Sequence, residues 1–274
     1  MHHRRYGDPV PELPEVETVR RGLEPRLVGR RLVEAWSHPS AKFSAAPEAV
    51  GRVVDAVGRR GKYLLVELDD RLTLVIHLGM TGQLRVAPPA DADPHDRAWW
   101  DLDDGNRFSF RDIRRFGRIA VVGDDRSALP TLAALGPEPF DPSFTAEHLW
   151  RSLRASRARL KTQLLSQRPV AGVGNIYADE ALWLAGVNPA ARSISRPAAA
   201  RLRDAIVAVL DAGVANGGTT LRDYRTVDGG TGDNQHHLAC YGRAGEPCER
   251  CGTELRRRTI DARTTTWCPR CQRR

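Results

Sequence analysis

Four cysteines near the C-terminus constrain the fold of this 274-residue chain more than any other feature. They form two pairs, Cys248-x2-Cys251 and Cys268-x2-Cys271, with sixteen residues between the pairs. This spacing is typical of a ribbon in which four thiolates hold one tetrahedral zinc ion, whereas disulfides are unfavourable in a reducing compartment. Four thiolates leave no position for water, so the predicted zinc is structural. A fifth cysteine, Cys240, has no predicted metal role.

The charge of the chain indicates a polyanionic partner. Basic residues outnumber acidic ones by 42 to 34, and the 34 residues from Tyr241 onwards carry nine arginines against four acids, a net charge of +5. A basic region of this kind is the usual electrostatic feature of nucleic-acid binding. No apolar run approaches the ~20 residues that cross a membrane, and residues 1–10 lack the apolar stretch of a secretory signal. These observations predict a soluble cytoplasmic protein without membrane contacts.

Lysine is rare in this chain. Only three of the 42 basic residues are lysines, at Lys42, Lys62 and Lys161. Where a lysine persists in an arginine-rich chain, arginine is a poor substitute for its compact, deprotonatable ammonium. Lys62 and Lys161 are therefore candidate functional residues, although chance retention explains any single one of them.

The hydrophobic pattern divides the chain into a strand-rich part and a helix-rich part. From about residue 32 to 123, short segments rich in β-formers are separated by Gly and Asp turns, and from about 145 to 218 the periodicity is helical. We expect strands at 62–68, 72–78, 107–110 and 118–122 and an exposed loop at 87–98. We expect helices at 148–154, 161–167, 176–185 and 197–214 and a long loop at 222–239. This order predicts an α+β protein of two domains with a boundary near residue 140.

The segment at 11–23 (PELPEVETVRRGL) places a proline and a carboxylic acid at the start of a short helix. Pro14 suits the first helical turn and Gly22 lies near a plausible helix end. At a chain terminus, a proline nitrogen is a secondary amine that can form an iminium with a sugar aldehyde. The positive end of a helix disfavours an ammonium and so favours the neutral, reactive amine. When the segment is taken alone, an ordinary acidic helix start is the better explanation.

The segment at 169–180 (PVAGVGNIYADE) places two glycines between helical segments. The backbone N–H groups of such a turn can close on a phosphate, with a helix N-terminus directly behind them. Asn175, at the start of that helix, is either a simple N-cap or a phosphate ligand.

Together these segments resemble the formamidopyrimidine-DNA glycosylase family, over the chain from Pro11 to the C-terminus. The segment at 11–23 is similar to the start of that family, and the segment at 169–180 is similar to its helix–two-turn–helix element. The resemblance implies that Pro11 attacks the sugar of an oxidised nucleotide, that Glu12 is the general acid and that Glu15 orients the site. It also implies that Lys62, in 61–65 (GKYLL), contacts phosphate and helps the elimination steps, and that Arg263 reaches the phosphates flanking the lesion.

The resemblance implies further DNA contacts in the β-rich part. The segment at 77–82 (HLGMTG) ends a strand in a turn that exposes Met80, and Arg114 and Phe116 follow a second turn. Met80 and Phe116 would be apolar wedges in the base stack, and Arg114 would read the orphaned cytosine. The complete set of implied DNA-binding residues is His77, Met80, Arg114, Phe116, Lys161, Asn175 and Tyr241.

The resemblance implies four segments. Residues 1–10 are an extension absent from the mature enzyme, because a tertiary amide at Pro11 has no lone pair to give. A valine start codon at Val10 explains the extension most simply, ahead of proteolytic trimming or a permanently blocked protein. Residues 11–140 form a catalytic antiparallel β-sandwich with a flanking helix, and residues 141–239 form the helix–two-turn–helix domain with its lesion loop. Residues 240–274 form the zinc ribbon as a β-hairpin.

The function implied is that of a monomeric, nucleoid-associated bacterial enzyme acting on double-stranded DNA with oxidised bases or abasic sites. It would be a bifunctional glycosylase and AP lyase for oxidised purines, needing one structural zinc and no catalytic metal. Many family members carry an aromatic pair just before Gln235, where this chain has Asp233 and Asn234. One alternative is an endonuclease VIII-type enzyme for oxidised pyrimidines, which Leu13 and the segment 221–224 argue against. The other is a non-catalytic damaged-DNA binder.

Overall fold

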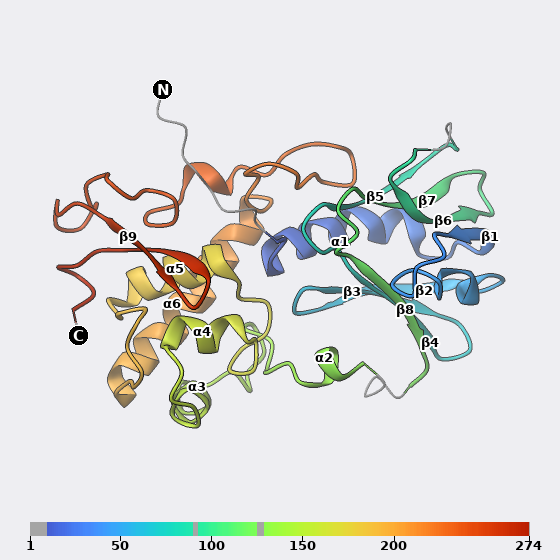
Figure 1. The fold of residues 1–274 in the computed structure, drawn as a ribbon. Helices are drawn as coiled ribbons and strands as arrows, with labels where there is room; N and C mark the ends of the chain where they lie inside the picture. Colours follow the sequence, from blue (N-terminus) through green and yellow to red (C-terminus); the bar gives the residue numbers. More distant parts are fainter. Residues whose placement is uncertain (1–9, 90–92, 125–128, 274) are drawn as a thin grey trace.

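The computed structural model of the protein describes residues 10–89, 93–124 and 129–273. The strands of the two large sheets lie on one side of the molecule and helices α3 to α6 lie on the other (Figure 1). Helix α1, Leu13–Leu27, contacts strand β2 on the first side and helix α6 on the second. Within the described residues, no helix combines the length and the apolar character needed to cross a bilayer.

Eight strands form two antiparallel sheets of four strands each. The sheets have the orders β1-β6-β7-β5 and β2-β3-β4-β8. Inward side chains such as Leu64 and Ile76 from one sheet and Trp100 and Phe108 from the other form a single buried core. The strands are β1 Leu32–Ser37, β2 Val54–Arg60, β3 Tyr63–Leu68, β4 Leu72–His77, β5 Gly82–Ala87, β6 Asp96–Leu102, β7 Arg107–Asp112 and β8 Arg118–Val122, with the short 3-10 helix η1 at Ala46–Ala49.

The helical part has its own core, centred on α5. Nine of the eleven residues of α5 are buried, so this helix is enclosed by its neighbours. Among those neighbours, α3 and α6 begin with side-chain caps, in which Thr145 accepts from His148 N and Ser195 accepts from Ala198 N. The elements are α2 Pro130–Ala133, α3 Ala146–Arg154, α4 Leu160–Leu165, α5 Asn175–Ala185, α6 Arg196–Ala215 and the 3-10 helix η3 at Asn234–His236.

Helix α1 connects the two cores. Its first residue, Leu13, is buried among the helices, whereas Val16, Val19 and Leu23 are buried against the two sheets. The residues directly before α1 therefore lie where the two parts of the molecule meet.

The last two strands, β9 Arg256–Ile260 and β10 Arg263–Trp267, form a separate antiparallel hairpin. Its two-residue turn is made by Asp261 and Ala262, whose φ angles of 44° and 63° are both positive. Such a turn matches the twist of the flanking strands and leaves Arg263 at the hairpin tip.

The predicted α+β class is confirmed, with antiparallel sheets, a helical part and a β-hairpin. Two local predictions are wrong. Helix α1 does not end near Gly22 but continues to Leu27, and Gly22 is small because Val227 packs there; a Cβ would lie 3.0 Å from Val227 Cγ2. The expected loop at 87–98 is also too long, since β6 begins at Asp96 and Ala98 is fully buried.

Candidate active site

Glu12 lies at the N-terminus of α5, although it belongs to the segment before α1. Its carboxyl group accepts hydrogen bonds from the backbone N–H groups of Gly174 at 2.6 Å, Ile176 at 2.8 Å and Tyr177 at 3.4 Å. The side chain is only 1% exposed. Burial raises the pKa of Glu12, against the opposing effects of the Lys62 charge and the three amide donors. A buried carboxyl with a raised pKa is suited to donate a proton.

Glu15 supports Glu12 from the first turn of α1. One of its oxygens accepts from Glu12 N at 2.8 Å, and the other accepts from Thr219 N at 2.6 Å and from the Tyr177 hydroxyl at 2.9 Å. Burial and the neighbouring Glu12 raise the pKa of Glu15 to about 7. Glu15 is therefore hydrogen-bonded to the backbone that carries Glu12, and its predicted role in orienting the site stays a prediction.

A cavity of about 190 Å³ brings residues from five separate parts of the sequence together. Glu12 and Lys62 line it with Asn175 at the start of α5, Tyr241 before the ribbon and Arg263 at the hairpin tip. All five were predicted from the sequence as site residues. Lys62 is 8% exposed, and burial lowers its pKa against the raising effect of Glu12 and Glu15. Val10, directly before the buried Pro11, also lines the cavity.

Gly174 allows the side chains of Glu12 and Lys62 to lie close to the N-terminus of α5. A Cβ at this position would lie 2.4 Å from Glu12 Cδ and 2.5 Å from Lys62 Nζ, so the carboxyl and the ammonium would have to leave their places in the cavity. Gly172 in the same turn has a φ of +84°, and a Cβ there would lie 2.6 Å from the Leu13 side chain. The two glycines of the 169–180 segment therefore admit the carboxylate and the α1 start to the α5 terminus.

Asn175 is the first residue of α5 rather than its cap. Gly174 occupies the N-cap position, so the interpretation of Asn175 as an N-cap is wrong. The Oδ1 atom of Asn175 is buried and has no hydrogen-bond partner within the described residues. The side-chain amide of Asn175 is therefore not used to cap α5, and it remains available for the predicted phosphate contact.

The predicted wedge residues lie on two turns that touch. A Cβ on Gly79, before Met80, would lie 2.4 Å from Gly117 N and 2.5 Å from the Phe116 carbonyl carbon. Phe116 is 49% exposed, and the Arg114 Cζ atom lies 5.0 Å from the centre of its ring. Met80 is partly buried rather than exposed. Met80 lies 34 and 36 positions before Arg114 and Phe116 in the sequence, and the fold brings their two turns into contact.

His77 ends strand β4 beside Lys62. Its Nδ1 accepts from Gly79 N at 3.1 Å, which leaves Nε2 as the protonated nitrogen of a neutral ring. Burial, with the charges of Lys62 and Arg118, lowers the pKa of His77 to about 4. His77 is therefore uncharged at neutral pH, and any contact it makes with DNA is a hydrogen bond from a neutral ring.

Lys161 does not reach the surface. Its side chain is fully buried, its Nζ lies 2.6 Å from Asp179 Oδ1, and it donates to Thr264 O at 2.9 Å and Thr265 Oγ1 at 3.0 Å. A phosphate cannot approach this ammonium without opening the core. We therefore replace the predicted DNA contact of Lys161 with a structural role: the residue joins α4 and α5 to strand β10.

The four ribbon cysteines form the predicted metal site. The Sγ atoms of Cys248, Cys251, Cys268 and Cys271 all lie within 4.8 Å of one another, as a tetrahedral zinc requires. Trp183 of α5 donates its indole N–H to Cys248 Sγ at 3.4 Å. The ribbon is a site for one structural zinc.

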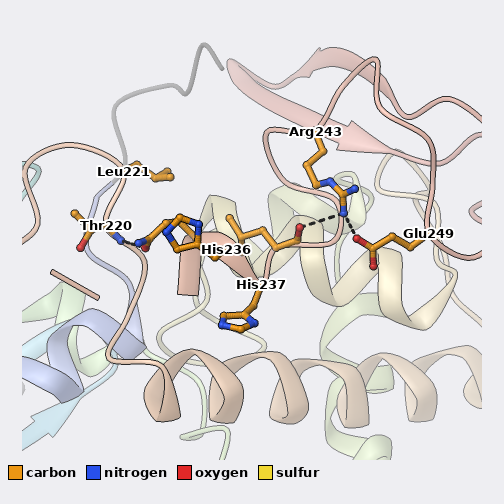
Figure 2. A pocket seen from close by; sticks show the side chains of 8 residues that line it. Thr220, Leu221, His236, His237, Arg243 and Glu249 are labelled. Carbon is orange, nitrogen blue, oxygen red and sulfur yellow. Dashed lines mark hydrogen bonds and ion pairs between the residues drawn. The ribbon is translucent and has the colours of Figure 1, made fainter. Parts of the chain in front are cut away.

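The segment that follows α6, residues 217–239, is here called the 217–239 loop. A larger hollow of about 720 Å³ lies between the two ends of this loop and the ribbon (Figure 2). Thr220, His236, His237 and Arg243 are among its lining residues. Arg243 is already paired with Glu249 and with Glu246, so its charge is largely neutralised. None of the residues predicted to be catalytic lines this hollow.

Comparisons with known proteins match almost the whole chain. Family models match in three parts: the formamidopyrimidine-DNA glycosylase N-terminal domain at 10–119, the H2TH domain of the same enzymes at 135–225, and the zinc finger found in FPG and IleRS at 245–274. A formamidopyrimidine-DNA glycosylase from Herpetosiphon aurantiacus is 46% identical, covering 96% of this chain and all of the relative. This chain belongs to the formamidopyrimidine-DNA glycosylase family.

Solved structures of the family agree with the fold. The crystal structure of the MutM (FPG) protein from Thermus thermophilus superposes with a TM-score of 0.88 at 44% identity, covering 96% of this chain and 98% of that one. The complex between the Lactococcus lactis Fpg and DNA containing an abasic site superposes with a TM-score of 0.86 at 34% identity, covering 96% and 100%.

Sequence reasoning missed several polar residues that hold the site together. Asp179 accepts from Thr266 N at 2.9 Å, and Glu180 accepts from the backbone N–H groups of residues 239, 240 and 241. Tyr177 and Asn234 were likewise not assigned a role. The only available signal was acidic residues within an otherwise apolar helix, because buried carboxylates require partners.

Lys161→Met should destabilise the protein without changing how its DNA binding depends on salt. Removing one partner of a buried ion pair leaves the other uncompensated and costs about 3–5 kcal/mol. Urea unfolding would measure this loss, and adding Asp179→Asn to the variant should recover part of it. The slope of log affinity against log salt should stay as in the wild type, whereas Arg263→Ala, the matched control, should lower it by about 1. If Lys161→Met also made this slope shallower, the predicted phosphate contact of Lys161 would be correct and the structural role wrong.

Removing zinc should unfold the ribbon selectively. Metal binding in such a ribbon contributes on the order of 10 kcal/mol, which is also folding energy. Chelation should therefore expose the amides of residues 245–273 to hydrogen exchange while the two sheets stay protected. Cys248→Ser should reproduce this and abolish DNA cleavage, since Arg263 would lose its position. Carefully purified protein with less than one zinc per chain would contradict the assignment.

Proposed function

We propose that this protein is a bifunctional DNA glycosylase and AP lyase that excises oxidised purines in base excision repair. One observation carries the proposal: the carboxyl of Glu12 is buried at the α5 N-terminus, next to Pro11, in a cavity shared with Lys62 and Arg263. Similar proteins have been solved with DNA containing Fapy-dG and carbocyclic 8-oxo-G. Membership of the family supports both the glycosylase and the lyase activity.

The reaction begins at the sugar of the extruded nucleotide. The nitrogen of a free Pro11 forms a bond to C1′ as the bond from C1′ to the base breaks. The base leaves with that electron pair and takes up the proton that the Pro11 nitrogen loses once it is bonded to C1′. Glu12 donates its proton to the ring oxygen, which opens the sugar and leaves an iminium between Pro11 and C1′. Loss of a proton from C2′ then expels the 3′ phosphate, and a second elimination expels the 5′ phosphate.

The remaining predicted residues bind and deform the DNA. Lys62, Asn175 and Arg263 surround the cavity and suit the phosphates next to the lesion. Met80 and Phe116 fill the gap that the extruded nucleotide leaves in the stack, and Arg114 bonds the unpaired partner base. The contact between the two turns supports this assignment, because the apolar side chains that enter the stack and the arginine that bonds the partner base must act at the same base-pair step.

The proposed organisation follows the predicted segments, with a catalytic domain at 11–140, a helix–two-turn–helix domain with its loop at 141–239 and the ribbon at 240–274. The two separate hydrophobic cores and the cysteine-centred ribbon cluster support this division. We further propose that the protein acts as a monomer, located in the cytoplasm at the nucleoid. A DNA substrate supports a location at the nucleoid.

Residues 1–10 are proposed to be absent from the active enzyme. Residues 1–9 lie outside the described part of the chain, but Val10 lines the reactive cavity and makes Pro11 a tertiary amide. Translation from Val10, followed by removal of the initiator methionine, would free the Pro11 amine. With a free Pro11 amine the protein is an enzyme, whereas with a blocked Pro11 it only binds damaged DNA.

Glu12→Gln should retain binding to abasic-site DNA and lose base excision. Binding depends on phosphate contacts, whereas excision needs a proton donor, and general acid catalysis contributes roughly 10²–10⁴-fold. Single-turnover excision of 8-oxoguanine and the dissociation constant for abasic DNA would be measured on the same preparation. Excision at near the wild-type rate would show that Glu12 is not the general acid.

Protein made from its own gene should begin at Pro11 and should be trapped on DNA by borohydride. Intact mass and N-terminal sequencing give the start, and trapping on an 8-oxoguanine duplex reports the iminium. A version that begins at Met1 and cannot be processed is the matched control, and it should bind abasic DNA without being trapped. Trapping by that blocked version would refute attack by Pro11 and make Lys62 the first alternative amine.

A further inference from the structure

Asn234 is a buried polar residue at the C-terminal base of the 217–239 loop. Its side chain is 4% exposed, and each of its polar atoms is used. The Nδ2 group donates to Thr219 Oγ1 at 2.9 Å and to the Tyr177 hydroxyl at 3.3 Å, while Oδ1 accepts from Asn216 Nδ2 at 3.1 Å. An amide with both sides satisfied in the interior specifies one position for the segment that carries it.

The partners of Asn234 lead directly to Glu15. The Tyr177 hydroxyl donates to Glu15 Oε1 at 2.9 Å, and Thr219 donates to the same atom through its backbone N–H at 2.6 Å. The other oxygen of Glu15 accepts from Glu12 N at 2.8 Å, which is the amide of the peptide bond that joins Pro11 to Glu12. A continuous chain of buried hydrogen bonds therefore runs from the loop to the peptide that carries the reactive amine.

Residues 223–228 of the loop are attached to helix α1 and to strand β5. Val227 packs at Gly22 of α1, Asp228 pairs with Arg26, and Asp223 O accepts from Gln83 Nε2 at 2.7 Å. These attachments lie far from the loop's two ends.

The two ends of the loop meet beside the large hollow. Thr220 N donates to Gln235 Oε1 at 2.8 Å, and Thr220 and His236 both line the hollow (Figure 2). Asn234, directly before Gln235, thus closes the loop at the point where the loop meets the Glu15 network.

We propose that Asn234 is a positioning residue that couples the placement of the 217–239 loop to the geometry of the Pro11–Glu12 peptide. The inference rests on the proposed function, and nothing in that function requires Asn234. In this chain, a change in the loop is transmitted through hydrogen bonds to the groups that perform the chemistry.

Asn234→Leu tests the coupling, because leucine keeps the approximate shape of asparagine and removes every polar atom. Excision of 8-oxoguanine and borohydride trapping on a preformed abasic site should both slow by roughly tenfold to a hundredfold, as small misplacements of reacting groups do. The dissociation constant for abasic DNA should stay within about twofold, because the side-chain hydrogen bonds of Asn234 within the described residues go to Asn216, Tyr177 and Thr219, none of which is assigned to phosphate binding. Equal zinc content and thermal midpoints would show that the variant is folded.

A double-mutant cycle with Tyr177→Phe tests the route. Tyr177→Phe removes one oxygen between Asn234 and Glu15, so it should slow both steps by itself even if Asn234→Leu does not fold. If Asn234 acts through this network, the double variant should be about as slow as the slower single variant. Multiplicative effects of the two substitutions would overturn the proposed route.

Asp233→Ala is the matched control. Asp233 precedes Asn234, its side chain is 70% exposed, and it pairs with the exposed His236 and His237. This variant should match the wild type in both steps. Unchanged excision and trapping in folded Asn234→Leu would overturn the inference while leaving the proposed function intact, whereas absence of trapping by wild-type protein with a free Pro11 would overturn the proposed function itself.

Discussion

The site depends on the N-terminus of a helix enclosed within the protein. The first turn of α5 directs three backbone N–H groups at one buried carboxyl group, that of Glu12, and so satisfies donors that an isolated helix leaves unpaired. The same helix carries Tyr177 towards Glu15, Asp179 towards strand β10 and Glu180 towards the segment before the ribbon. A single rigid element therefore sets the positions of the acid, its supporting carboxylate and the hairpin that presents Arg263. Shifting α5 would move all three together.

Such an arrangement is stable only when it is complete. A buried donor or acceptor that loses its partner costs about 1–3 kcal/mol, more than a satisfied hydrogen bond contributes. The Lys161–Asp179 pair and the Glu15 network both lie at contacts between segments distant in sequence, so their cost on misassembly favours one arrangement of sheets, helices and ribbon. Close packing enforces the same arrangement at Gly174, where no Cβ fits between Glu12 and Lys62.

Residues whose chemistry is evident from type and spacing could be predicted from the sequence. The four cysteines, the Pro11–Glu12 pair and the glycines of the 169–180 segment each carry a local signature, and the structure brings them to one metal site and one cavity. Predictions that depend on neighbours failed. Lys161 is an ordinary basic residue by sequence, and only the fold shows that Asp179 and β10 enclose it. A glycine near the end of a helical pattern predicts a helix end. The actual reason for Gly22 is the packing of Val227, which lies about two hundred positions away and is not evident from the local sequence.

One environment serves both partners of the proposed reaction. Burial disfavours any charged form, so it raises the pKa of Glu12 and lowers the pKa of Lys62 in the same cavity. A free amine at Pro11 would meet the same low dielectric, with Lys62 and Arg263 as cationic neighbours on the cavity wall. Both effects disfavour an ammonium and leave the nitrogen lone pair available. The same burial therefore shifts both groups in the direction that the proposed reaction needs, the acid towards its protonated form and the amine towards its neutral form.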